Sequence, residues 1–596
     1  MKFMKKLFLG ALLTLVTFTS CKNEIKKVEA KMVNKAFNDV LDTYNEENYK
    51  LFPLNATYAG ETKFNDQLPN NLTNEFSEKL NLFYTKTKAD LFKFNENELS
   101  ENEILSKGIL IWECDVNLER LNFKEDLMPI NQFYSITLTI GQFAGGTSAQ
   151  PFMTVKDYNN WLKRLNLYVN ILDTAEVKMR EGIQKGYVLP KSLIVKIIPQ
   201  LENLAINNIE NHLFYSPVKN MPDLFSTDEK KNISDAYFKI IEKKIVPAHQ
   251  KLANFFKNEY LKAGRESSGI SDIPNGNEYY NFLIKYYTTT NMTAEEIHNL
   301  GLSEVEKIKT EMEKIKTQVG FKGDLKSFFN HVRNRKELMP FTKPQQVIDN
   351  FNAIHDKMKP QIEKLFEIKP KTHFKVRRTE AFREASASAE YNQGSLDGTR
   401  PGVFYVPIPN VTSYNMFSDE DLFLHEAIPG HHYQISLTQE STVLPKFRKT
   451  LWYSSYGEGW ALYSESLGKE LGLYTDSYQY FGMLSAEMHR AIRLVVDTGM
   501  HTKNWSREKA IQYSMDNEAE SEASIISEIE RYMAIPGQAL SYKIGQLKIR
   551  ELRSKAENEL GDKFNIKEFH NQILETGCVP LKLLEEKIDN WIETTN

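Results

Sequence analysis

The chain has 596 residues and a formal net charge of −4, and 41% of its residues are hydrophobic and 12% aromatic. This apolar content excludes a disordered chain and allows a large buried core. The small net charge gives no bulk attraction to nucleic acid or to an anionic membrane surface, so we expect no nucleic-acid partner.

The N-terminus is typical of a targeting segment. Lysines at positions 2, 5 and 6 precede an apolar run over residues 7–18 that is too short to span a bilayer comfortably. The sequence Phe18-Thr19-Ser20-Cys21 resembles a bacterial lipobox, with phenylalanine in place of the usual leucine. We therefore predict a lipoprotein signal peptide over residues 1–20, a lipid on Cys21 and a tether over residues 21–34. The alternative is an ordinary signal peptide with a coincidental cysteine.

This prediction has a consequence for location. Export followed by lipidation implies an extracytoplasmic protein that is anchored to a bacterial membrane, in the periplasm or at the cell surface. The lipid would then be its only contact with the membrane.

Helical periodicity dominates the remaining chain. Apolar residues recur at three- and four-residue steps over residues 158–172, 544–560 and 569–592, and residues 293–296 form a capping box that opens another helix. Gly, Ser and Pro cluster over residues 264–276, which indicates a junction. We predict a mostly α-helical protein with an N-terminal lobe over residues 35–270 and a C-terminal lobe over residues 271–596.

One segment is typical of a β-strand. Residues Gly402–Pro407 combine β-branched and aromatic side chains between a glycine and a proline. The strand has two interpretations: its edge pairs with an extended peptide, or it belongs to a plain hairpin in a small sheet. The sequence favours neither.

Residues 425–432 read HEAIPGHH and open like the H-E-x-x-H helix of zinc hydrolases. In that motif two histidines one turn apart bind zinc, and the glutamate beside the first activates a water molecule. Ser418 or Asp419 fits the start of this helix. Pro429 cannot donate a hydrogen bond to the carbonyl of His425, so we expect a bulge or break between the histidines.

The break decides which later histidine binds metal. On an ideal helix His431 lies about 240° around the axis from His425, whereas His432 lies about 20° away but about 10.5 Å further along. If Pro429 and Gly430 bulge out, His431 returns to the one-turn position. We therefore favour His425 and His431 as ligands, with His432 as a supporting or substrate-contacting group, and keep His432 open as the alternative ligand.

A third ligand is expected from another helix. Residues 456–465 read YGEGWALYSE, and Glu458 and Glu465 lie seven residues apart on one helix face. An acid in so apolar a segment needs a partner, and a metal ion supplies one. We predict Glu458 as the third ligand and Glu465 as the group that anchors a ligand histidine. The alternative is a solvated acidic face.

Four motifs follow one another in the second half of the chain: HEAIPGHH, GEGWALYSE, RLVVDTGMH (493–501) and RYMAIPGQALSYKIG (531–545). Together they resemble the bacterial family called domain of unknown function 885, from about residue 35 to the C-terminus. That family is similar to gluzincin metallopeptidases of the thimet-oligopeptidase and angiotensin-converting-enzyme type. The resemblance implies two helical lobes that flank a deep active-site channel, with a small β element near the zinc helix.

The resemblance also bears on the ligands. Gly430-His431 matches the Gly-His that ends the shorter gluzincin motif, which supports His431. Glu458 matches the zinc-ligand glutamate of the Asn-Glu-Gly-Phe element in aminopeptidase-N-like enzymes, and Glu465 matches a second glutamate seven residues later. The two-residue insertion between the histidines departs from the pattern.

Peptide hydrolysis further needs donors for the oxyanion. Arg493, Asp497 and His501 lie four residues apart, so they form one stripe on a helix. By similarity to the gluzincins, His501 and a tyrosine, Tyr532 or Tyr542, would polarise the scissile carbonyl. The sequence does not rank the two tyrosines.

The combined prediction is a zinc-dependent metallopeptidase that hydrolyses short peptides. Zinc would bind His425, His431 and Glu458, and Glu426 would be the general base toward water. The alternatives are a zinc hydrolase of a non-peptide amide or ester, and a non-catalytic binding lipoprotein with a degenerate metal site.

The position of cleavage is left open by the sequence. An enzyme that removes residues from the carboxyl end needs a cation for the substrate carboxylate, and Arg400 and Lys543 are candidates.

Overall fold

The structure is a computed structural model that describes residues 33–146, 148–380, 384, 387–396, 398 and 400–596. The predicted signal peptide, the Cys21 lipidation site and most of the tether lie outside these residues. Among the described residues, no helix is long and apolar enough to cross a membrane.

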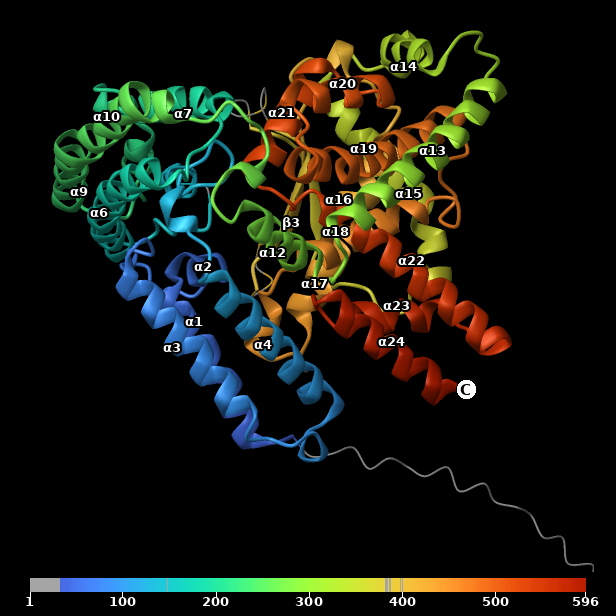
Figure 1. Cartoon of the computed structure of the whole chain (residues 1–596), viewed down its shortest axis with the longest axis horizontal. Helices are drawn as coiled ribbons and strands as arrows, with labels where there is room; N and C mark the ends of the chain where they lie inside the picture. Colours follow the sequence, from blue (N-terminus) through green and yellow to red (C-terminus); the bar gives the residue numbers. More distant parts are fainter. Residues whose placement is uncertain (1–32, 147, 381–383, 385–386, 397, 399) are drawn as a thin grey trace, which may run out of the picture.

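Helices make up most of the described chain, which confirms the predicted fold class (Figure 1). Those that begin before residue 290 are α1 (Lys35–Leu51), α2 (Pro53–Tyr58), α3 (Asn74–Leu91), α4 (Glu101–Arg120), α5 (Ile136–Ala144), α6 (Val155–Lys185), α7 (Lys191–Asn203), α8 (Ser216–Lys219), α9 (Thr227–Ile240), α10 (Val246–Phe255), α11 (Leu261–Ala263) and α12 (Gly276–Thr288). Those that follow are α13 (Ala294–Gln318), α14 (Leu325–Asn334), α15 (Pro344–Leu365), α16 (Asp419–Glu426), α17 (His431–Glu440), α18 (Ser454–Ser466), α19 (Ser477–Thr502), α20 (Arg507–Asn517), α21 (Glu522–Ala534), α22 (Leu540–Leu560), α23 (Ile566–Leu574) and α24 (Leu581–Thr595).

Three of the four predicted helices are confirmed. Residues 158–172 lie within α6, the capping box begins α13, and residues 544–560 lie within α22. The prediction of one helix over residues 569–592 is wrong, because that segment is divided between α23 and α24. Gly577, with φ +70°, lies in the connection, and Pro580 precedes the first residue of α24.

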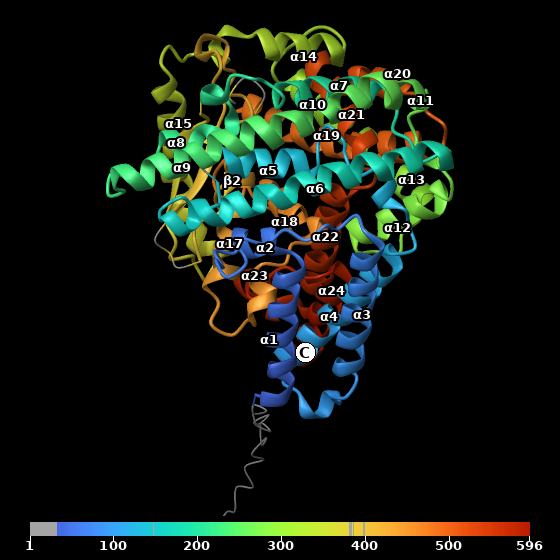
Figure 2. The ribbon, with the colours of Figure 1, turned by 90° about the vertical axis from the view of Figure 1, so that its left-hand side faces the viewer.

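Two hydrophobic cores organise the helices. The buried residues of the first core all lie between Leu68 and Tyr260, mainly in α5, α6, α7, α9 and α10. The second core joins α13 to α24 and also takes Phe37 of α1 and Leu110 of α4. The helices of the first core form the teal and green group in Figure 1, and Figure 2 shows them side by side across the front. The division of the chain at residue 270 stays a prediction, because α1 and α4 contribute to the second core.

The β element is a three-stranded sheet with the order β1 (Phe374–Arg378), β3 (Gly402–Val406), β2 (Glu390–Asn392). Strand β3 runs parallel to β1 and antiparallel to β2, and Phe404 and Val406 enter the second core. The predicted strand is therefore present, but both of its edges are paired. The suggestion that β3 offers an edge to a peptide is wrong, and the small-sheet interpretation is right.

Helices α18 and α22 touch through their backbones. A Cβ atom on Gly545 would lie 1.8 Å from the carbonyl oxygen of Ser455, and one on Gly459 would lie 2.5 Å from the carbonyl carbon of Gly545. A side chain at either glycine would force the helices apart. This contact fixes α18, the helix that carries Glu458 and Glu465.

Candidate metal centre

The HEAIPGHH motif is divided between two helices. Helix α16 ends at Glu426, α17 begins at His431, and the Ile428–Pro429 peptide bond between them is cis. The connection turns back closely on α16, since a Cβ atom on Gly430 would lie 1.9 Å from the carbonyl oxygen of His425. Glycine is required for this approach. The break expected at the proline is therefore present.

The turn brings His431 beside His425, with 4.8 Å between their ring centroids. The Nε2 atoms of His425 and His431 lie 3.6 Å and 3.3 Å from Oε2 of Glu458. One donor atom from each of these residues lies within 4.8 Å of the others. Tetrahedral zinc, with bonds of about 2.0–2.1 Å, separates its ligand atoms by about 3.3 Å. The spacing of this donor set, which we call the three-residue site, therefore fits zinc.

Glu465 holds the first histidine of the site. Its Oε1 lies 2.6 Å from Nδ1 of His425, so Nδ1 of the imidazole faces this carboxylate and Nε2 faces Glu458. Burial alone would lower the pKa of His425, but hydrogen bonds to Glu458 and Glu465 raise this pKa well above its usual value. The atoms that would bind a cation are thus held together by hydrogen bonds.

Burial and the neighbouring histidines also have opposite effects on the pKa of Glu458. Burial would raise the pKa of its carboxyl, but the charge of His431 and the hydrogen bonds from both histidines hold that pKa well below its usual range. The side chain of Glu458 is only 14% exposed. An ionised, nearly buried carboxylate beside two imidazoles is a donor set suited to a divalent metal.

Glu426 is the last residue of α16 and is buried. No hydrogen bond to its carboxyl is found among the described residues. Burial raises the pKa of Glu426, and the nearby His425 and His431 partly offset this rise. A carboxyl without a structural partner, adjacent in sequence to His425, is available to accept a proton.

His432 points away from the three-residue site and toward the small sheet. Its Nδ1 lies 2.9 Å from the hydroxyl of Tyr391 in β2, and its ring centroid lies 4.7 Å from that of Phe374 in β1. Burial lowers the pKa of His432 to about 4, so the ring is neutral. The geometry therefore favours His431 as the ligand and gives His432 the task of joining α17 to the sheet.

His501 and Tyr532 are both buried, and their polar atoms have partners. The Nδ1 of His501 accepts from the backbone N–H of Ile270 at 2.9 Å, and its Nε2 donates to the carbonyl of Tyr532 at 3.1 Å. Burial lowers the pKa of His501 to about 3. The Tyr532 hydroxyl donates to Glu528 at 2.7 Å and accepts from Arg493 at 3.0 Å. This geometry gives no support to their predicted role in polarising a carbonyl.

Tyr542 differs from Tyr532 in its surroundings. It is partly exposed on α22, and its hydroxyl lies 3.4 Å from Nη2 of Arg531. The guanidinium carbon of Arg493 lies 4.5 Å from the centre of its ring. Of the two tyrosines that the sequence left unranked, Tyr542 is the one with an available hydroxyl.

The two cations considered for a substrate carboxylate have other partners. Lys543 is fully buried and lies 3.0 Å from Glu304 and 2.8 Å from Glu487. Arg400 is exposed and donates to the backbone carbonyl of Gln393 at 2.9 Å, within the loop between β2 and β3. Lys543 thus joins α13, α19 and α22, and Arg400 stabilises a turn.

Sequence reasoning missed Arg490, which lies one turn before Arg493 on α19. Burial raises the pKa of Glu426, and the positive charge of Arg490 is among those that lower it. The sequence pattern that could have identified Arg490 is its position three residues before Arg493, on the same side of one helix.

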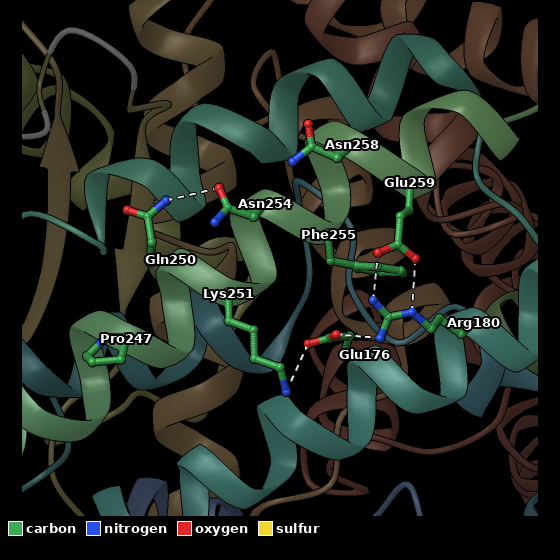
Figure 3. A pocket seen from close by; sticks show the side chains of 9 residues that line it. All are labelled: Glu176, Arg180, Pro247, Gln250, Lys251, Asn254, Phe255, Asn258 and Glu259. Carbon is green, nitrogen blue, oxygen red and sulfur yellow. Dashed lines mark hydrogen bonds and ion pairs between the residues drawn. The ribbon is translucent and has the colours of Figure 1, made fainter.

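A surface depression between α6 and α10 belongs to the first core and contains no residue of the three-residue site. Figure 3 shows that its charged side chains are paired. Arg180 donates to Glu259 at 2.7 Å and 3.0 Å, and Lys251 lies 3.2 Å from Glu176. Because these charges neutralise one another, the depression offers no group for chemistry.

The contact between Glu465 and His425 leads to a prediction. Replacement of Glu465 by glutamine removes the carboxylate that orients the imidazole, so zinc affinity is expected to fall by about 10-fold to 100-fold. Competition with a chromogenic chelator measures this affinity. Glu470→Gln is the matched control, since Glu470 pairs with Arg553 at 3.0 Å and is 40% exposed. Unchanged zinc affinity in Glu465→Gln would contradict the orienting role.

Comparison with known proteins identifies relatives that match most of the chain. The family model "Bacterial protein of unknown function (DUF885)" matches residues 53–588. No curated protein matches. Two solved structures, both described as a putative lipoprotein, share the fold. The one from Colwellia psychrerythraea is 26% identical, with a TM-score of 0.85 over 94% of this chain and 99% of that chain. The one from Shewanella oneidensis, described as of unknown function, is 19% identical, with a TM-score of 0.73 over 92% of this chain and 99% of that chain.

Proposed function

The chain belongs to the family of bacterial proteins of unknown function DUF885, and we propose that it is a zinc-dependent metallopeptidase that hydrolyses short peptides. The convergence of His425, His431 and Glu458 beside Glu426 carries this proposal. Two histidines and one carboxylate leave a fourth position open, as catalytic zinc sites do and structural ones do not. A glutamate without a structural partner next to a ligand is needed for catalysis but not for a structural metal.

In the proposed mechanism, each residue of the site has a separate role. Bound zinc would supply a Lewis acid that acidifies water and polarises a carbonyl. Glu426 takes a proton from the attacking water and passes it to the leaving amine. Glu465 keeps His425 in the tautomer that presents Nε2. Tyr542 donates a hydrogen bond to the carbonyl oxygen as negative charge develops there.

The proposal also includes a relationship to gluzincin peptidases and a location outside the cytoplasm. A Glu-containing site on a mostly helical fold supports the similarity to gluzincin peptidases that the motifs indicate. The likeness to the Colwellia protein supports a lipid on Cys21 and an extracytoplasmic position at a bacterial membrane. Mass spectrometry of the N-terminal peptide from membranes would detect that lipid.

Metal analysis and a substrate panel test the proposed activity. The purified mature protein is expected to hold about one zinc ion per chain, to cleave short unfolded peptides, to lose that cleavage after chelation and to regain it with zinc. If the protein cleaves only esters or non-peptide amides, it is a zinc hydrolase of another class and not a peptidase. A protein that holds no zinc and cleaves nothing would be a binding lipoprotein, which contradicts the proposal.

A further inference from the structure

Three arginines lie on α19 or on the neighbouring helix α21. Arg490 and Arg493 are one turn apart on α19, and Arg531 comes from α21. We call these residues the arginine group. Arg531 and Arg493 contact the hydroxyl and the ring of Tyr542.

Helix packing places the arginine group beside the helices that carry the three-residue site. A Cβ atom on Gly482 would lie 2.0 Å from the carbonyl oxygen of Phe417 and 2.8 Å from Cα of Ser418, so α19 and α16 touch there. Arg493 of α19 also lies 4.5 Å from the ring of Tyr542 on α22, the helix whose Gly545 touches Gly459 beside Glu458.

Two buried guanidinium nitrogens in this group have no acceptor among the described residues. Arg493 is 5% exposed; its Nε donates to Tyr532 and its Nη2 contacts Glu528 at 3.0 Å, but its Nη1 has no partner. Arg490 donates through Nη1 to the carbonyl of Ala486 at 3.2 Å, and its buried Nε has no partner. Buried donors of this kind are costly, so a ligand that accepts from both would be favoured.

The charges around the group are also unbalanced. Arg493 and Arg531 share one carboxylate, Glu528, at 3.0 Å and 3.3 Å. Arg490 has no carboxylate within ion-pair distance in the part of the chain that the structure describes. The neighbouring His489 is paired with its own acid, Glu518. Among the described residues, the three arginines therefore have one carboxylate, Glu528, within ion-pair distance, and the buried Asp421 and Glu426 interact with Arg490 only at longer range.

We propose that Arg490 and Arg493 bind a carboxylate of the substrate. This inference rests on the proposed peptidase function and gives it a substrate class: peptides with a carboxylate a short distance from the scissile bond. A guanidinium presents N–H donors in a planar fork that matches a carboxylate. The carboxylate comes from the C-terminus of the peptide, as in an enzyme that removes residues from that end, or from an acidic side chain.

A kinetic comparison tests the proposal on the full zinc-loaded protein. Matched short peptides carry a free C-terminus, an amidated C-terminus, or an amidated C-terminus with an internal glutamate. Wild type is expected to cleave the free acid with a kcat/KM about 10-fold to 100-fold above that of the neutral amide. If the glutamate peptide alone shows this preference, the bound carboxylate is a side chain. Equal rates for all three peptides would overturn the proposal.

Two variants connect the preference to the arginines. Arg490→Met and Arg493→Lys are each expected to bring the ratio of free acid to amide close to one. Arg490→Met covers the case in which Arg493→Lys fails to fold. Arg550→Met is the matched control, because Arg550 pairs with Glu487 at 3.4 Å, outside the arginine group, and should retain the preference. A preference that survives both arginine variants would overturn the assignment.

A binding measurement separates this inference from the proposed function. Fluorescence anisotropy on Glu426→Gln protein compares labelled free-acid and amidated peptides without requiring hydrolysis. Tighter binding of the free acid, lost in Glu426→Gln/Arg490→Met, supports the carboxylate site even if the wild type cleaves no peptide. Equal affinity in this assay, together with zinc-dependent cleavage by wild type, leaves the peptidase intact and overturns the carboxylate site.

Discussion

Replacement of Glu426 by glutamine is expected to lower kcat/KM for peptide hydrolysis by about 100-fold to 10,000-fold, the range for loss of a general base. The amide is nearly the same size as the carboxyl but cannot accept the proton from water. Because Glu426 forms no hydrogen bond with His431 or Glu458 in the described part of the chain, the zinc content is expected to stay near that of wild type. Peptide kinetics and metal analysis on the same preparation measure both quantities.

The shorter carboxylate in Glu426→Asp supplies the matched control. It keeps a base at this position but withdraws it by one methylene group, so its activity should lie between those of wild type and Glu426→Gln. Peptide cleavage that persists in a zinc-loaded Glu426→Gln protein would show that another group takes the proton.

Replacement of His431 by alanine is expected to remove zinc, whereas His432→Ala should retain it. The Nε2 of His431 lies 3.3 Å from the Glu458 carboxylate, while the Nδ1 of His432 contacts the Tyr391 hydroxyl. Loss of a ligand should weaken affinity by more than the roughly 100-fold attributed to orienting groups. Zinc titration of each variant tests the difference.

Thermal unfolding of each variant shows whether a loss of zinc comes from a loss of the fold. His432→Ala removes a buried contact to the sheet, so it is expected to lower the melting temperature more than it changes zinc affinity. Zinc loss in His432→Ala with the fold intact, and zinc retention in His431→Ala, would reverse the ligand assignment.

Much of the candidate site was predictable because its residues follow local rules. Pro429 cannot continue a helix, and Gly430 permits the tight turn, so the return of His431 follows from chain chemistry. The seven-residue spacing of Glu458 and Glu465 places both acids on one helix face whatever the rest of the fold does. The motif and its spacing therefore predict the site, because a single turn positions His431 and a single neighbouring helix positions Glu458 and Glu465.

The parts that the sequence does not specify depend on contacts between distant segments. The position of β3 between two other strands is set by β1, which is separated from β3 by 23 intervening residues and has no comparable sequence signal. His501 shares a helical stripe with Arg493, but a stripe does not show which neighbours it meets. Its contact with the backbone of Ile270 comes from a segment 231 residues away. The periodicity of a sequence does not predict contacts between residues so far apart in the chain.

The contact between Gly459 and Gly545 has a mechanical consequence. Backbones that touch without intervening side chains leave little room for sliding or tilting, so α18 and α22 should move as one body. Glu458, next to Gly459, and Tyr542, three residues before Gly545, would then keep a constant separation as a substrate enters. Metal ligand and hydrogen-bond donor would be preorganised, and the motion that admits a peptide is expected from helices outside this pair.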